Sequence, residues 1–85
     1  MDFQVIFMDS FLEDLERILR TIANENPCAA GQLGNTIVAR AEQLSFFPER
    51  HTQVRSRPGL RRFIVARYFK VFYRIQYGPK IVEVL

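Results

Sequence analysis

The chain has 85 residues, of which 48% are hydrophobic and 25% are charged, and its formal net charge is +3. This length leaves room for one small core, so we expect residues 1–85 to form a single domain. The composition is that of a globular protein, and a single cysteine excludes an internal disulfide framework. No apolar run reaches membrane-spanning length, and residues 1–4 lack the basic start of a secretory signal. We therefore expect a cytoplasmic protein without a membrane partner.

The charge is divided unequally along the chain. Residues 1–49 contain three arginines and eight acidic residues, for a net charge of −5, whereas residues 50–85 contain nine basic residues and one glutamate, for a net charge of +8. Ten of the twelve cations are arginines, which suit bidentate contact with phosphate or carboxylate. The basic half indicates a nucleic acid or an acidic protein as partner. The alternative is that these arginines only keep exposed strands soluble.

The acidic half is predicted to form a strand followed by two helices. Residues 2–8 are rich in Val, Ile and Phe, as strands are. Ser10 with Glu13 has the spacing of a capping box, and leucines repeat at helical intervals as far as Ile22. Asn26 and Pro27 then suit the cap and first position of a second helix, which we expect to run to about residue 45. The short connection predicts an antiparallel helical hairpin.

The basic half is predicted to form a loop and three strands. Residues 46–59 lack periodicity and contain Pro48, Pro58 and Gly59, so we expect a surface connection. Residues 60–67, 69–77 and 80–85 read as strands, and Gly78-Pro79 marks a turn between the last two. The alternation of apolar and polar residues indicates a sheet covered on one face. The predicted order is β-α-α-β-β-β.

Together these segments resemble the RelE/ParE family of bacterial type II toxins over essentially the whole chain. The residues that carry the resemblance are the 10–22 helix, Asn26-Pro27 followed by Ala29-Ala30, Leu44-x-x-Phe47-Pro48, and Leu60-Arg61 leading into residues 68–75. The second and third of these patterns are closer to the ParE branch than to the ribonuclease branch.

The resemblance implies an α+β fold, in which the helical hairpin packs on one face of a twisted, mainly antiparallel sheet. It also implies a plasmid-stabilising toxin with a cognate antitoxin as partner, in a toxin–antitoxin hetero-oligomer. We expect a ParE-like inhibitor of DNA gyrase, which is not an enzyme. The alternatives are a RelE-like mRNA interferase acting on the ribosome, an inactive member that only binds antitoxin, and a plain nucleic-acid-binding module.

The chemistry of RNA cleavage requires a base, a cationic clamp on the phosphate and a proton donor. By resemblance to the RelE-like ribonucleases, Arg61 and Lys70 match two of their cations, whereas Phe63 stands where they carry another. Their essential Arg and their Tyr or His lie beyond the last strand, where this chain stops at Leu85. We therefore assign no catalytic residue. With one His and one Cys we expect no metal site of the usual zinc type and no cofactor.

The remaining candidates are cations and aromatics on the predicted sheet. We expect target or RNA contact by Arg61, Arg62, Lys70, Phe72 and Arg74, with Tyr68 as further aromatic surface. The alternative is that Phe72 and Tyr68 fill a second small core. His51, in a loop, is expected to be exposed, and Cys28, at the start of the second helix, is expected to be a small buried residue or a residue of the capping turn.

Overall fold

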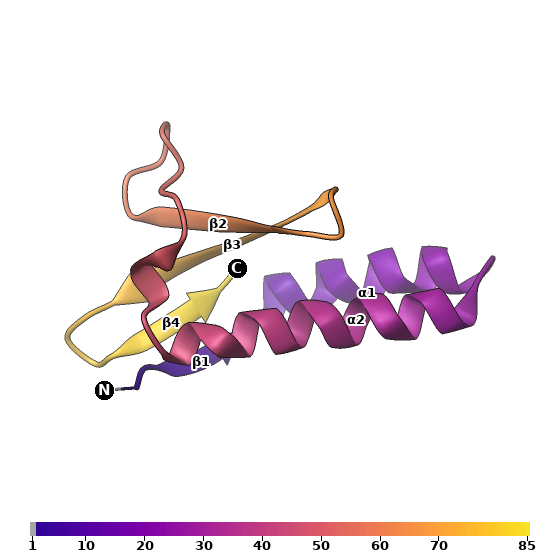
Figure 1. Ribbon diagram of the computed structural model, residues 1–85, viewed down its shortest axis with the longest axis horizontal. Helices are drawn as coiled ribbons and strands as arrows, with labels where there is room; N and C mark the ends of the chain where they lie inside the picture. Colours follow the sequence, from indigo (N-terminus) through magenta and orange to yellow (C-terminus); the bar gives the residue numbers. More distant parts are fainter. Residues whose placement is uncertain (1) are drawn as a thin grey trace.

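The computed structural model describes residues 2–85 and contains the six expected elements in the expected order (Figure 1). Two short 3₁₀ helices, η1 (Gln43–Ser45) and η2 (Pro48–Arg50), lie in the connection between the helices and the later strands. The main elements are β1 (Gln4–Phe7), α1 (Asp9–Ala23), α2 (Pro27–Glu42), β2 (Leu60–Val65), β3 (Phe69–Gln76) and β4 (Ile81–Val84).

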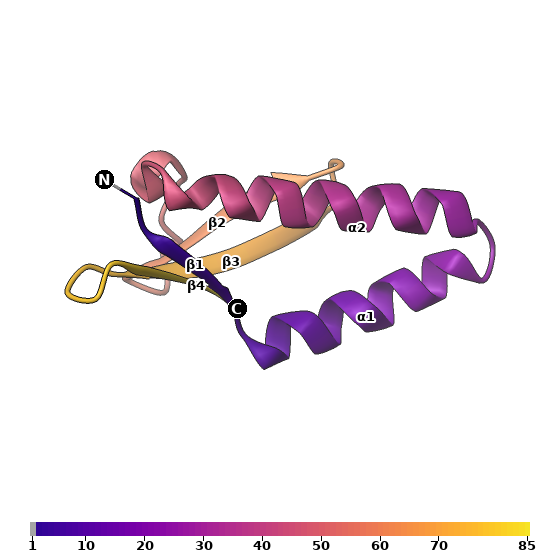
Figure 2. The ribbon, with the colours of Figure 1, turned by 90° about the horizontal axis from the view of Figure 1, so that it is seen from below.

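The four strands form one open mixed sheet in the order β1-β4-β3-β2. The β2–β3 and β3–β4 pairs are antiparallel, and β1 joins the edge by pairing parallel with β4. The helical hairpin runs along one side of the sheet, and its tip extends well beyond the strands (Figures 1 and 2). The α+β prediction is confirmed, because helices and strands are segregated as the resemblance implied.

The core lies where the helices meet the sheet. Phe11 of α1 and Ile37, Ala41 and Leu44 from α2 and η1 are buried against the strands. The buried residues of the sheet are Phe63, Val65, Val71, Tyr73, Val82 and Val84. These positions alternate along each strand, so residues at the positions between them face away from the helices.

The two helix starts differ in how they are capped. Asn26 caps α2 as predicted, since its side chain accepts from the amide of Ala29 at 3.0 Å. The capping box at Ser10 is wrong, because α1 begins at Asp9 with Met8 as its cap and no side-chain cap bond. Met8 still donates its amide to Val84 of β4 at 2.9 Å, so the helix follows the strand without a linker and Ser10 lies inside it.

The hairpin depends on a close approach at Gly34. A Cβ atom placed on Gly34 would lie 2.8 Å from Cδ1 of Leu19 on α1. The packing of the two helices therefore requires a residue without a side chain at position 34. Within residues 2–85, no helix is both long and apolar enough to span a bilayer.

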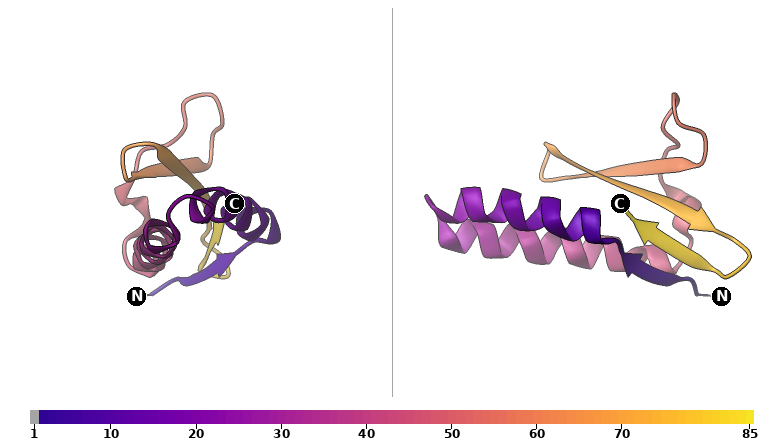
Figure 3. Two further views of the ribbon diagram at one scale, coloured as in Figure 1. Left: turned by 90° about the vertical axis from the view of Figure 1, so that its right-hand side faces the viewer. Right: turned by 180° about the vertical axis from the view of Figure 1, so that it is seen from behind.

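Two strand residues hold the connection of residues 46–59 against the sheet. The hydroxyl of Tyr73 donates to the carbonyl oxygen of Pro48 at 2.6 Å. Its cross-strand partner Arg61 donates through Nη1 to the carbonyl oxygens of Glu49 at 3.1 Å and His51 at 2.6 Å. The loop then runs beside β2 through a bridge between Gln53 and Arg61. We call Arg61 and Tyr73, with the carbonyls they hold, the loop clasp. Figure 3 shows the connection of residues 46–59 rising beside β2.

Candidate functional site

The surface that carries most of the predicted contact residues is the face of the sheet turned away from the helices, which we call the open face. Strand alternation assigns residues to it, because the buried residues Phe63 and Val65 of β2 and Val71 and Tyr73 of β3 occupy every second position and face the opposite side. Its members on the three C-terminal strands are Leu60, Arg62, Ile64, Lys70, Phe72, Arg74, Gln76, Ile81 and Glu83.

Cations and apolar side chains are paired across β2 and β3 on this face. Directly opposite residues are Arg62 with Phe72, Ile64 with Lys70, and Leu60 with Arg74. Residues opposed in this way have their Cβ atoms about 5 Å apart, so each cation lies beside an apolar neighbour. Arginine and aromatic residues in such a mixture are typical of the energetic centre of an interface.

One carboxylate of the open face is already engaged. Nε of Arg74 and Oε1 of Glu83 form an ion pair at 2.5 Å, and Nε2 of Gln76 donates to the same oxygen at 2.9 Å. These two donors, above all the Arg74 guanidinium, lower the pKa of Glu83 below its usual value. Glu83 is therefore ionised at neutral pH and acts as an acceptor for its two neighbours.

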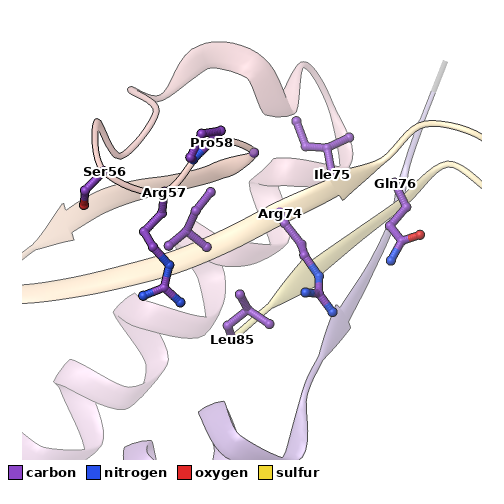
Figure 4. A pocket seen from close by; sticks show the side chains of 9 residues that line it. Ser56, Arg57, Pro58, Arg74, Ile75, Gln76 and Leu85 are labelled. Atoms are coloured by element: carbon purple, nitrogen blue, oxygen red, sulfur yellow. The ribbon is translucent and has the colours of Figure 1, made fainter.

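A cavity of about 680 Å³ opens at the end of this face nearest the turn before β2 (Figure 4). Pro58 and Gly59 form that turn, in which Leu60 donates to the carbonyl of Arg57 at 3.0 Å and Gly59 has a φ of 86°. A glycine with positive φ after a proline is the signature of a type II turn. Arg57 and Arg74 extend to the same side of the cavity, close to Leu85 (Figure 4).

A second cavity of about 430 Å³ continues along the face to Phe72. It shares Ser56, Arg57, Leu60 and Leu85 with the first. Together the two cavities make a groove, whose lining includes the cations Arg57 and Arg74 and the apolar side chains of Leu60, Phe72 and Leu85. Sequence reasoning missed Arg57, although the density of arginines between residues 50 and 62 was a signal that the loop also contributes charge.

The structure separates the five predicted contact residues. Arg62, Lys70, Phe72 and Arg74 lie on the open face, whereas Arg61 lies on the helix side and its guanidinium is used by the loop clasp. The neighbouring Tyr68 is 77% exposed in the β2–β3 turn, so it fills no second core, while Phe72 is half-buried.

The two chemically reactive side chains lie elsewhere. His51 is not exposed as expected but half-buried, with its ring stacked on Phe63 at 5.1 Å between centroids. Burial first, and then the charges of Arg40 and Arg50, lower the pKa of His51. Cys28 is exposed in the first turn of α2. Within residues 2–85, no three His, Cys, Asp or Glu side chains gather into a group that could hold a metal ion.

Comparison with known proteins adds a family and a fold. Residues 5–85 match the model of the family described as the ParE toxin of the type II toxin–antitoxin system parDE. The free-state structure of an E. coli toxin RelE variant, with two arginines replaced by alanine, has a TM-score of 0.71 to this chain. That likeness covers 99% of this chain and 79% of the other at 10% identity, and so concerns the fold alone. Curated proteins give no match.

Proposed function

The chain belongs to the ParE toxin family of type II toxin–antitoxin systems, and from that premise we propose that it stops growth by binding and inhibiting DNA gyrase. A toxin of such a system has an antitoxin as its partner. Under this proposal the open face and its groove contact the target, and neutralisation by the antitoxin prevents that contact.

The observation that carries the proposal is the chemistry of the open face. General acid–base catalysis needs a group whose pKa lies near the working pH. The carboxylate of Glu83 is instead held ionised by Arg74 and Gln76, and its pKa is lowered further from neutrality. The imidazole of His51 lies on the other side of β2, against Phe63. The face is therefore equipped for contact by cations and apolar groups, which supports inhibition by binding.

The second candidate is ribosome-dependent mRNA cleavage. The cations Arg62, Lys70 and Arg74 on one sheet face favour it, because a cluster of this kind stabilises the charge that develops on a phosphate. The fold shared with RelE is compatible with either activity. The two candidates differ in the process that stops first in the cell.

The decisive experiment follows DNA and protein synthesis separately by pulse labelling after induction in a bacterium without the antitoxin. Under the proposal DNA synthesis falls first, and purified protein inhibits supercoiling by gyrase. Early loss of protein synthesis with normal supercoiling would replace the proposal with the mRNA-cleavage candidate. Loss of neither would mean that the chain is inactive on both targets.

A charge-matched pair of variants tests the open face itself. The triple variant Arg62→Ala, Lys70→Ala and Arg74→Ala removes three exposed or half-exposed cations from this face. The control, Arg17→Ala, Arg20→Ala and Arg55→Ala, removes the same charge from exposed positions on α1 and the loop. We expect the first variant to lose toxicity and the control to keep it. Equal toxicity of the two variants would exclude the open face as the target surface.

A further inference from the structure

A third cavity, separate from the groove of the open face, lies at the outer edge of β2, on the side where α2 and the loop approach the strand. It is also lined by cations. Its volume is about 270 Å³, just below the roughly 300 Å³ at which pockets for drug-sized molecules begin. The size therefore suits a single small group. We call it the edge cavity, and its lining residues are Arg40, Arg50, His51, Thr52, Arg62, Phe63 and Ile64.

The cations of the edge cavity come from three different elements, and two of them, Arg40 and Arg50, are held in place. Arg40 of α2 lies over the ring of Phe63, 5.3 Å from its centroid, and His51 stacks on the same ring. Arg50 donates through Nε to the carbonyl of Phe47 and through Nη2 to that of Gln43, each at 3.1 Å. These contacts fix positive charge beside the cavity without neutralising it.

No carboxylate compensates this charge in the part of the chain that the structure describes. The salt bridges of residues 2–85 join Asp14 to Arg17, Glu16 to Arg20 and Glu83 to Arg74, and none involves Arg40, Arg50 or Arg62. The lowered pKa of His51 is consistent with this, because its electrostatic causes are the positive charges of Arg40 and Arg50.

Neutral donors complete the lining. Thr52 contributes a hydroxyl, and its carbonyl accepts the amide of Arg62 at 3.1 Å, so the amide of Arg62 points to the outer edge of β2. Amides alternate in direction along a strand, so the N–H of Ile64 points to the same edge. Loop residues 52–54 pair with this edge at Leu60, Arg61 and Arg62, and no other strand of residues 2–85 covers it, because β2 is the edge strand of the sheet.

We propose that the edge cavity binds a phosphate group. Guanidinium groups bind phosphate and carboxylate alike, but here the donors approach from a helix, a loop and a strand edge. A tetrahedral group has oxygens that point in several directions and meets such donors, whereas a carboxylate offers two oxygens in one plane. The source is either a free or terminal phosphate or a phosphodiester of a nucleic acid backbone. This inference does not depend on gyrase as the target.

Binding is tested by NMR titration of the intact protein with inorganic phosphate in a buffer free of other polyanions. We expect saturable shifts of the His51 imidazole and of the Thr52 and Ile64 amides. The variant Arg40→Gln should weaken phosphate binding about tenfold, which corresponds to about 1.4 kcal/mol. Arg40 is chosen because Arg62 also belongs to the open face, so a result here does not repeat the test of the proposed function.

The matched control is Arg55→Gln, which removes an exposed cation outside the cavity and should leave the affinity unchanged. If Arg40→Gln fails to fold, Thr52→Val removes one neutral donor from an exposed loop residue and should weaken binding by a smaller factor. The inference is overturned if no saturable shift occurs, if both cavity variants bind as the parent does, or if acetate binds as tightly as phosphate.

Two further titrations distinguish the sources. A 5′-phosphorylated mononucleotide presents a terminal phosphate, and a DNA duplex without terminal phosphates presents only phosphodiesters. Arg40-dependent binding of the mononucleotide alone assigns a terminal phosphate, and Arg40-dependent binding of the duplex assigns the backbone. Binding of both ligands with the same affinity in Arg40→Gln would overturn the proposal.

Discussion

Arg61 and Arg62 are adjacent in the sequence, yet β2 places them in different regions of the molecule. Arg61 lies on the helix side, where its guanidinium holds the carbonyls of Glu49 and His51. Arg62 lies opposite Phe72 on the open face. Likewise, Phe63 and Tyr73 lie on the helix side, whereas Phe72 and Arg74 lie on the open face. One side of the β2–β3 hairpin therefore stabilises the fold, and the other is free for contact.

The charge excess of residues 50–85 therefore serves two different purposes. Part of it is used internally, because the guanidinium groups of Arg50 and Arg61 donate to backbone carbonyls of the connection between α2 and β2. Only the remainder is available for a target. Net charge alone therefore overestimates the number of cations on the binding surface. The alternation of side chains between the two faces of a strand decides which cations belong to that surface.

The largest expected effect is the difference in unfolding free energy between Phe63→Ala and Phe72→Ala. Phe63 is 4% exposed in the core, so Phe63→Ala should lower the free energy of unfolding by about 3–5 kcal/mol. Phe72→Ala should lower it by less than about 1 kcal/mol, because Phe72 lies on the open face and is only half-buried. Urea denaturation of both variants measures the difference. Equal losses would show that the open face is a second core.

The two arginines provide the next contrast. Arg61→Ala leaves two loop carbonyls without their charged donor and should cost about 1.5–3 kcal/mol of unfolding free energy. Arg62→Ala should change stability by less than about 0.5 kcal/mol but reduce toxicity. Thermal unfolding and a growth assay on the same two variants give both readouts. A toxic, destabilised Arg62→Ala together with a stable, inactive Arg61→Ala would reverse our assignment.

Tyr73→Phe tests the other half of the loop clasp. Loss of its hydroxyl leaves the Pro48 carbonyl without a donor, and we expect a loss of about 1–1.5 kcal/mol. Burial raises the pKa of Tyr73 to about 12, so the unfolded chain loses this proton at lower pH than the folded one. Stability should therefore fall as the pH rises from about 10 towards 12.

The control for this pH dependence is the variant Tyr73→Phe, because it has no phenol group at position 73 that could ionise. The difference in unfolding free energy between the parent and Tyr73→Phe, measured by urea titration at several alkaline pH values, should shrink across this interval. A constant difference would mean that the hydroxyl ionises equally in both states, in conflict with its burial.

Sequence reasoning recovered the element order because that order depends on local signals, whereas the α+β class was implied by the resemblance to the RelE/ParE family. Helical spacing, the Asn26 cap and the period of two in residues 60–77 are each readable without tertiary information. The start of α1 was missed because it is fixed by a distant contact, the bond from Met8 to Val84 in the last strand. A capping box at Ser10 is a local preference, and pairing of β1 with β4 overrides it.

The candidate site was only partly predictable for a related reason. Alternation along a strand places Arg61 and Arg62 on opposite faces, but in residues 61–66 each face carries one of these arginines and two apolar residues, so this segment alone did not indicate which face meets the helices. The loop clasp joins Tyr73 to Pro48 across 25 residues, and the edge cavity joins α2 to the loop and β2. Contacts of this kind depend on the register of the sheet, which one sequence does not specify.

The smallest expected effect concerns His51, whose ring stacks on Phe63 between the cations of the edge cavity. Its pKa is lowered, first by burial and then by Arg40 and Arg50, so the unfolded chain takes up the proton at higher pH than the folded one. Stability should therefore decrease as the pH falls through about 6.5, the usual value for histidine. His51→Phe retains an aromatic ring on Phe63 and removes the titration. The parent should lose stability relative to this variant between pH 7 and pH 5, measured by thermal unfolding, and added phosphate should reduce that loss if the edge cavity binds it. A parent that gains stability on acidification would show that a nearby anion, and not the arginines, dominates the field at His51.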